Sequence, residues 1–133
     1  MPMLFVNLPV RDLTVARDFY GALGYRFHDH FSDEGTAAVV VADDIAVMLH
    51  TRDRFADLVA GKVGDPSRET TAVHSLSVES RAEVDDLVQR ALDAGGKPWL
   101  PSREGNGGYR GSFTDPDGNV WEAIWLGQQH VIN

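Results

Sequence analysis

Cysteine is absent from the 133 residues of the chain. Its absence excludes disulfides, thiolate metal ligands and a cysteine nucleophile, and it fits a reducing compartment. The N-terminal residues also lack the basic segment followed by a hydrophobic segment that marks a secretory leader. We therefore expect a cytoplasmic protein.

Clusters of basic residues and long hydrophobic runs are missing as well. The chain has 12 Lys and Arg against 20 Asp and Glu, a formal net charge of -8. Such a field repels phosphate backbones, so nucleic acid is not an expected partner. The longest run of small apolar residues, 37–42, is far too short to cross a bilayer, so no membrane association is expected. The ordinary hydrophobic fraction of 43% predicts one packed globular domain.

The first half of the chain predicts one helix and four strands. Residues 3–10 alternate apolar side chains with period two, which indicates a strand. Asp12 is placed to cap a following amphipathic helix, and Gly24 is placed to end it. Three further strands are predicted at 25–31, 36–42 and 45–50.

The second half repeats this order. A strand is predicted at 71–79, and Ser80 with Glu83 forms a capping box ahead of a helix that ends at Gly95. The remaining strands are predicted at 97–100, 109–114 and 120–126. Between the halves, residues 51–70 combine a short helix after Asp53 with a segment rich in glycine and proline.

The two halves therefore constitute an internal repeat of one βαβββ unit, and the predicted fold class is α+β. In each half a helix cap, Asp12 or Ser80, follows the last valine of a strand by two positions. We expect a single domain over residues 1–133. Its parts are module 1 at 3–50, the linker at 51–70, module 2 at 71–126 and a tail at 127–133.

Two motifs at matching places in this repeat resemble the vicinal oxygen chelate superfamily. They are Val10-Arg11-Asp12 leading to Phe19-Tyr20-x-x-Leu23-Gly24, and Phe113-x-Asp115-Pro116-Asp117-Gly118-Asn119-x-Trp121-Glu122. The superfamily includes glyoxalase I, bleomycin-resistance proteins, fosfomycin-resistance enzymes and extradiol dioxygenases. Within it, residues 78–85 and Trp121-Glu122-x-x-Trp125 are most similar to bacterial proteins described as predicted lactoylglutathione lyases.

The resemblance implies that the two βαβββ units form an open, barrel-like cleft with the helices outside, and that the protein is a homodimer. Strand alternation then assigns side chains to faces. Leu4, Val6 and Leu8 are expected under a helix. The opposite, inward faces are expected to carry Phe5, Asn7, Met48, His50, Ser75, Ser77, Val120, Glu122 and Ile124.

Metal-dependent members of the superfamily bind one divalent ion through the first and last strands of each unit. The matching positions here are Phe5, Met48, Val73 and Glu122, of which only Glu122 is a suitable ligand. We therefore expect no metal cofactor. An alternative is a displaced site in which Glu122, His50 and His74, with Asn7, bind Ni, Zn, Mn, Co or Fe.

Glu122 and His50 are the candidate catalytic residues, since a carboxylate and an imidazole on inward faces can act as an acid–base pair. Glu122 could instead be paired with Arg110, and His50 could be a polar residue at a strand end. Trp121 and Trp125 are expected in the core. The candidate ligand-binding residues are Phe5, Asn7, Met48, Ser75, Trp99, Tyr109, Arg110 and Phe113.

Two functions remain open at this point. One is a bleomycin-resistance-like protein that binds a planar or cationic small molecule in a dimeric cleft without a metal. The other is an enzyme: a glyoxalase I-like, metal-dependent lyase of the lactoylglutathione lyase type, a dioxygenase with a displaced metal site, or a metal-free isomerase using Glu122 and His50.

Overall fold

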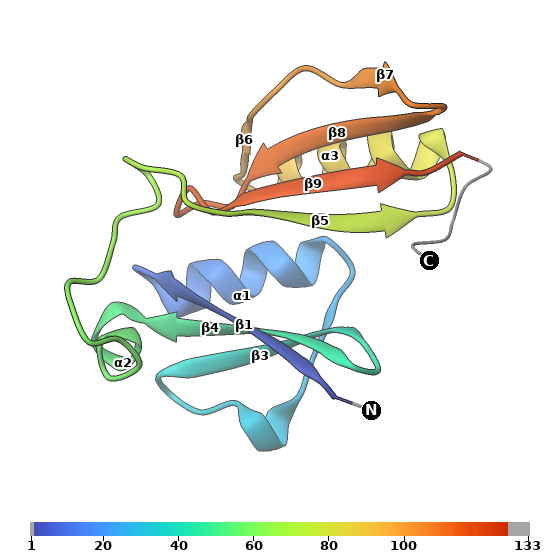
Figure 1. Ribbon diagram of the computed structural model, residues 1–133. Coiled ribbons are helices and arrows are strands. Elements are labelled where there is room, and N and C mark those ends of the chain that lie inside the picture. The colour runs from blue at the N-terminus through green and yellow to red at the C-terminus, as the bar shows by residue number, and fades with distance from the viewer. Residues whose placement is uncertain (1, 128–133) are drawn as a thin grey trace. The chain divides into compact units, whose positions relative to one another are not determined.

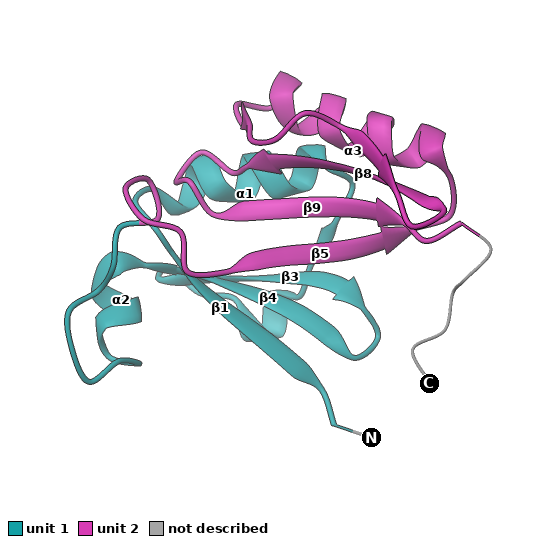
Figure 2. Ribbon diagram, turned by 45° about the horizontal axis from the view of Figure 1, so that its top comes forward, with its two compact units in different colours: residues 1–65 teal, residues 66–133 magenta. Residues whose placement is uncertain are grey.

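The computed structural model of the chain describes residues 2–127. The chain divides into two compact units, with the boundary between Asp65 and Pro66 inside the 51–70 segment (Figures 1 and 2). Most of the tail expected at 127–133 lies outside the described residues. Over the described part of the chain, none of the helices combines the length and the hydropathy that a membrane span requires.

Unit 1 contains one four-stranded sheet and two α-helices. The sheet order is β1-β4-β3-β2, in which β1 and β4 are parallel and the other neighbours are antiparallel. The elements are β1 (Leu4–Val10), α1 (Leu13–Ala22), β2 (Arg26–Phe27), the 3-10 helix η1 (Asp29–Phe31), β3 (Thr36–Ala42), β4 (Ile45–Thr51) and α2 (Arg52–Ala56).

In its described residues, 66–127, unit 2 contains one helix and a five-stranded sheet. The order is β5-β9-β8-β6, with β7 also paired to β8, and β5 is parallel to β9. The elements are β5 (Val73–Val78), α3 (Arg81–Asp93), β6 (Lys97–Pro98), β7 (Arg103–Gly105), β8 (Gly108–Thr114) and β9 (Val120–Trp125).

The expected α+β fold and its internal repeat are confirmed, because in each unit the first strand pairs in parallel with the last strand, β1 with β4 and β5 with β9.

The expected helix-capping residues are also confirmed. Asp12 Oδ1 accepts a hydrogen bond from the Val15 amide at 3.1 Å, and Ser80 Oγ accepts one from Glu83 at 3.1 Å. In return the Glu83 carboxylate accepts from the amide of Glu79 at 2.9 Å, which completes the box one residue earlier than the standard form.

In unit 1, α1 packs on the face of the sheet that carries the apolar side chains of alternating positions. The buried residues of this layer are Leu8, Val10, Ala16, Phe19, Tyr20, Val39, Val47 and Leu49. Leu4 was expected in the same layer, but it is 57% exposed. It lies at the first position of β1, at the opposite end of the strand from buried Val10, so the expectation is wrong at that position.

In unit 2, α3 lies along one face of the sheet formed by β8 and β9 (Figure 2). Gly111 of β8 marks this face, since a Cβ there would lie 2.9 Å from Val88 Cγ2 and 3.2 Å from Val84 Cγ1. Val84 and Val88 belong to α3, so the missing side chain lets the helix approach the sheet closely. The neighbouring buried residues on this face are Phe113, Trp121 and Ala123.

Three segments differ from the sequence-based expectation. The strand expected at 25–31 is confined to Arg26–Phe27, because the chain turns into η1 directly afterwards, and the strand expected at 97–100 is confined to Lys97–Pro98. Between the strands expected at 97–100 and 109–114, residues 105–108 form the tip of a β-hairpin between β7 and β8, with positive φ at Asn106 (51°) and Gly107 (79°). Asn-Gly is the pair of residues that tolerates this turn best, and it places β7, which was not predicted, beside β8.

Candidate functional site

The face of the unit 1 sheet opposite α1 carries the predicted residues Phe5, Asn7, Met48 and His50. Asn7 of β1 is opposite Met48 of β4, and strand alternation places Phe5 and His50 on the same side. The side chain of Phe5 is 45% exposed, whereas His50 is only 7% exposed. The ring of Phe55 from α2 lies with its centroid 6.4 Å from that of His50, so α2 covers the end of this face.

His50 is held by hydrogen bonds at both ring nitrogens. Its Nδ1 is 2.8 Å from Thr36 Oγ1, and its Nε2 is 2.8 Å from Asn7 Oδ1. Thr36 reaches the ring because it is the cross-strand partner of His50 in the β3–β4 pair. The structure thus brings together His50 and Asn7, two of the predicted site residues, and adds Thr36.

A salt bridge extends this group toward the surface. Arg54 Nη1 donates to Thr36 Oγ1 at 3.1 Å and forms an ion pair with Asp33 Oδ2 at 3.1 Å. Gly35 leaves room for the guanidinium, since a Cβ there would lie 2.8 Å from Arg54 Nη2. Burial, followed by the positive charge of Arg54, lowers the pKa of His50, while Asp33 opposes the shift.

In unit 2, Ser75 of β5, Glu122 of β9 and Arg110 of β8 meet on the face opposite α3. Ser75 Oγ donates to Glu122 Oε1 at 2.9 Å, and Arg110 Nη1 lies 3.5 Å from Glu122 Oε2. The side chain of Glu122 is 15% exposed and that of Arg110 is 30% exposed. The pairing of Glu122 with Arg110 that the sequence left open is therefore present, and both carboxylate oxygens have a partner.

A buried turn fixes the start of β9 and hence the position of Glu122. Asp115 is 1% exposed, and its Oδ1 accepts from the amides of Asp117 and Asn119, each at 2.9 Å. Its Oδ2 accepts from Asn119 Nδ2, also at 2.9 Å. Gly118, at the tip of the turn, has φ of 101°, which favours glycine.

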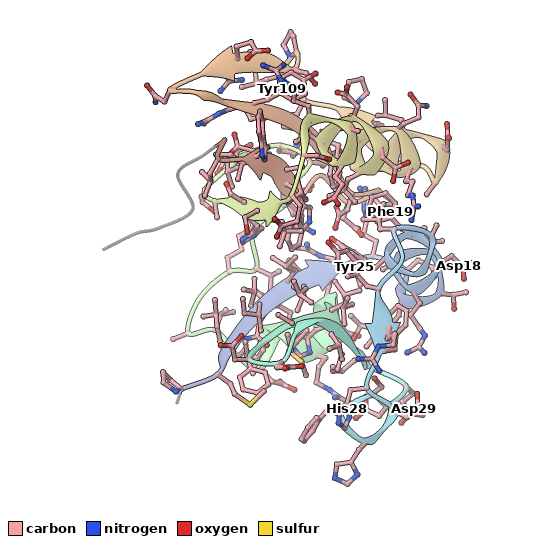
Figure 3. All side chains as sticks on the ribbon, turned by 90° about the vertical axis from the view of Figure 1, so that its right-hand side faces the viewer. Asp18, Phe19, Tyr25, His28, Asp29 and Tyr109 are labelled. Carbon is pink, nitrogen blue, oxygen red and sulfur yellow. The ribbon has the colours of Figure 1, made fainter. Side chains whose placement is uncertain are left out.

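Other predicted ligand-binding residues lie elsewhere in unit 2. Tyr109, labelled in Figure 3, donates from its hydroxyl to Asp85 of α3 at 2.7 Å, so it lies on the helix-covered face. This hydrogen bond raises the pKa of Tyr109. Phe113 is 1% exposed on the same face, whereas Trp99, just after β6, is 43% exposed. The structure does not bring these three residues to Glu122.

His74 lies on the opposite face of the sheet from Glu122. Its ring centroid is 5.0 Å from that of Trp121, its cross-strand partner, on the side that α3 covers. Burial lowers the pKa of His74. Because neighbouring residues of a strand alternate between faces, binding of one ion by His74 and Glu122 would require a change of register.

The divalent ion implied by the resemblance does not fit the donors that each unit provides. Three of the four matching positions, Phe5, Met48 and Val73, have no ligand atom suited to Ni, Zn, Mn, Co or Fe. The oxygens of Glu122 are engaged by Ser75 and Arg110, and both nitrogens of His50 are hydrogen-bonded. Between residues 2 and 127, no group of three His, Cys, Asp or Glu side chains is arranged to hold a metal.

Sequence reasoning missed Thr36, Arg54 and Asp33. Thr36 opens a predicted strand, and its pairing with His50 depends on the register of the hairpin. Arg54 and Asp33 lie 21 positions apart and meet only through the fold. The local sequence signal for Asp33 is an Asp-x-Gly turn, in which Asp33 Oδ1 accepts a hydrogen bond from the Gly35 amide at 2.9 Å.

Comparison with known proteins identifies relatives of the whole fold. The family model described as Glyoxalase/Bleomycin resistance protein/Dioxygenase superfamily matches residues 3–123. No curated protein gives a significant sequence match.

Solved structures similar to this chain carry related descriptions. A glyoxalase-related enzyme from Fulvimarina pelagi has a TM-score of 0.81 at 24% identity, covering 94% of this chain and 88% of that one. A glyoxylase/bleomycin resistance protein/dioxygenase domain from Frankia sp. EAN1pec has a TM-score of 0.70 at 26% identity, covering 98% and 95%. A fosfomycin resistance protein from Mesorhizobium loti has a TM-score of 0.66 at 18% identity, covering 92% and 90%.

Proposed function

Since the chain belongs to the glyoxalase/bleomycin resistance protein/dioxygenase superfamily, we propose that it binds a small organic molecule without a divalent metal. The observation that carries the proposal is the exposed ring of Phe5 beside the polar side chain of Asn7, on the face of the sheet opposite α1. Small-molecule sites combine apolar surface with a few fixed polar groups, and this face offers both.

Unit 2 has a polar group of its own on the face of its sheet opposite α3. Glu122 is held by Ser75 and Arg110, so its orientation is fixed and its charge is balanced by an ion pair. A fixed, partly exposed carboxylate and guanidinium can recognise donors and acceptors of a ligand. We propose that Ser75, Arg110 and Glu122 are polar ligand contacts of unit 2.

The alternative is a glyoxalase I-like lyase, for which Glu122 is the supporting residue. It is 15% exposed and occupies the position that the resemblance assigns to a ligand. As a base, Glu122 would remove a proton from a hemithioacetal, with His50 as the predicted partner. The donor sets of the two units argue against this alternative, because the lyase requires a divalent ion.

The finer features implied by the resemblance are part of the proposal. They are a homodimer in which paired units enclose the ligand cleft, a cytoplasmic location, and membership of the group described as predicted lactoylglutathione lyases. Sedimentation velocity at micromolar concentration tests the dimer directly. A monomer at all concentrations would contradict it.

The proposed function is tested by thermal unfolding with a panel of aromatic acids, amides and amines, each measured with and without EDTA. A molecule that binds only the folded chain raises the melting temperature in proportion to the logarithm of its concentration above Kd. We expect at least one compound to raise it equally in both conditions. The same compound should lose its effect in Phe5→Ala and keep it in Val15→Ala, because Val15, 48% exposed on α1, is a control of similar exposure.

Two results would count against the proposal. Stabilisation that appears only when a divalent metal is added would favour the lyase, as would conversion of the hemithioacetal of methylglyoxal and glutathione into a thioester. A compound effect that Val15→Ala abolishes as strongly as Phe5→Ala would mean that the Phe5 face is not the site.

A further inference from the structure

Five polar side chains of unit 1 form one continuous hydrogen-bonded series that ends at the open face of the sheet. It runs from Asp33 through Arg54, Thr36 and His50 to Asn7. The middle of the series is buried, since Thr36 is 5% and His50 is 7% exposed. Asn7, at the end, is exposed.

The direction of the hydrogen bonds follows from Arg54 on one side of the buried pair and from Asn7 on the other. A guanidinium has only donors, so Thr36 Oγ1 accepts from Arg54 Nη1. The Asn7 side-chain oxygen can only accept, so Nε2 of His50 donates to it and the hydroxyl proton of Thr36 is directed to His50 Nδ1, 2.8 Å away. A neutral imidazole that accepts at Nδ1 carries its proton on Nε2, and Nε2 lies 2.8 Å from Asn7.

The same contact leaves the nitrogen end of the Asn7 amide for the open face of the sheet. Nε2–H of His50 donates to Oδ1 of Asn7, so the amide oxygen is occupied. The amide nitrogen of Asn7 is turned away from the ring, and its one contact within the described residues is the Phe5 carbonyl at 3.5 Å, at the limit of a hydrogen bond. The amide nitrogen has two N–H donors, and the second has no acceptor among the described residues, so Asn7 presents a donor on the open face.

The surroundings of this donor are apolar. Met48 is the cross-strand neighbour of Asn7, and Phe5 lies two positions earlier on the same face of β1. The charges of the series, Arg54 and Asp33, are at its other end and neutralise each other in an ion pair. An apolar surface with one oriented N–H donor favours an oxygen acceptor joined to an apolar body, and it disfavours a cation.

We infer that Asn7 anchors a carbonyl or carboxylate oxygen of the ligand through Nδ2, while the apolar part of the ligand lies on Phe5 and Met48. His50, Thr36 and Arg54 are positioning residues that keep the amide in the donating orientation. The inference rests on the proposed small-molecule function, and it restricts the class of ligand to molecules with an oxygen acceptor.

The direction of the series is tested without any ligand, by NMR of the 15N-labelled full chain at pH 7.5. Long-range 15N–1H correlations distinguish the two neutral tautomers of a histidine. We expect His50 to be protonated at Nε2 in the wild type and in Thr36→Ser, and to lose this preference in Thr36→Val. A His50 protonated at Nδ1 in the wild type would overturn the inference.

The ligand class is tested with two probes of the same skeleton, N,N-dimethylbenzamide and N,N-dimethylbenzylamine. The first has a carbonyl acceptor and no N–H, and the second is a cation with one N–H donor at pH 7.5. We expect the amide to shift the Asn7 side-chain signals and the backbone amides of Phe5 and Met48. Its Kd should rise about threefold to tenfold in Asn7→Asp, which keeps the size and removes the donor.

The remaining outcomes separate this inference from the proposed function. Equal binding of both probes, or equal binding of the amide by wild type and Asn7→Asp, would overturn the inference and leave the proposed function standing. If neither probe shifts the backbone amide signals of Phe5 or Met48, the inference is overturned. The proposed function is then decided by the compound panel with its Phe5→Ala and Val15→Ala variants.

Discussion

The imidazole of His50 and the hydroxyl of Thr36 face each other across the β3–β4 hairpin, with Nδ1 and Oγ1 2.8 Å apart. Both side chains are buried, and burial of a polar group is tolerated when it is hydrogen-bonded. The pair links Arg54, at the edge of the unit, to Asn7 on the open face. The same hydrogen bonds therefore contribute to the stability of unit 1 and set the orientation of Asn7, its candidate ligand contact.

Replacing Thr36 by valine keeps the shape of the side chain and removes the hydroxyl. His50 Nδ1 and Arg54 Nη1 then lose a partner inside the protein. We expect Thr36→Val to lower the free energy of unfolding by about 1 to 3 kcal/mol, the cost of leaving buried polar groups unsatisfied. Urea denaturation at pH 7.5 measures it, with Thr36→Ser as the control that retains the hydroxyl. Equal destabilisation by both substitutions would contradict the account.

The lowered pKa of His50 predicts how stability depends on pH. Burial and the charge of Arg54 disfavour the imidazolium, so the unfolded chain binds this proton more readily than the folded chain does. Stability contributed by the neutral ring is complete above the ordinary histidine value of 6.5 and is lost as pH falls below it toward the folded pKa. The pKa of His74 is lowered by burial and acts in the same direction.

We therefore expect the free energy of unfolding to fall between pH 7.5 and pH 5, and to fall less in His50→Gln, which retains only the contribution of His74. Urea denaturation at a series of pH values measures the difference. A His50→Gln variant with the full pH dependence of the wild type would show that His50 is not the group responsible.

Among the residues of the turn before β9, substitution of Asp115 is expected to lower the free energy of unfolding most. Alanine would remove the acceptor of three hydrogen bonds, those from the amides of Asp117 and Asn119 and from Asn119 Nδ2, at a buried position. We expect Asp115→Ala to destabilise the chain by about 3 kcal/mol. Asp43→Ala is the matched control, since Asp43 lies exposed in the corresponding turn of unit 1 and should change stability by less than about 0.5 kcal/mol. Similar losses in both variants would argue against this role of Asp115.

The repeat and its caps could be read from the sequence because each depends on local chemistry. Asp12 and Ser80 follow their strands by two positions and cap their helices as expected, and Gly24 has φ of 101°. The short strand β7 could not be predicted in this way. Its pairing is made by the Asn106-Gly107 turn and by β8, while its own residues lack an apolar alternation.

The candidate site was predictable only in part, for a reason visible at the β3–β4 turn. A two-residue turn pairs Ala42 with Ile45, and continued without interruption it would place Ala37 opposite His50. An irregularity between Val40 and Ala42 shifts the register by one, so Thr36 takes that place. A pattern of alternation does not reveal such a bulge, and the partners Arg54 and Asp33 depend on it.

The central claim is that the chain binds its ligand without a divalent metal, because the donors of Glu122 and His50 are already used within the protein. The most direct test is elemental analysis of the purified chain, paired with melting curves after chelation and after addition of Ni, Zn, Mn, Co or Fe(II). The account predicts metal far below stoichiometric amounts and no metal-induced shift that distinguishes wild type from Glu122→Ala. Near-stoichiometric metal, or a shift of several degrees that Glu122→Ala abolishes, would contradict it.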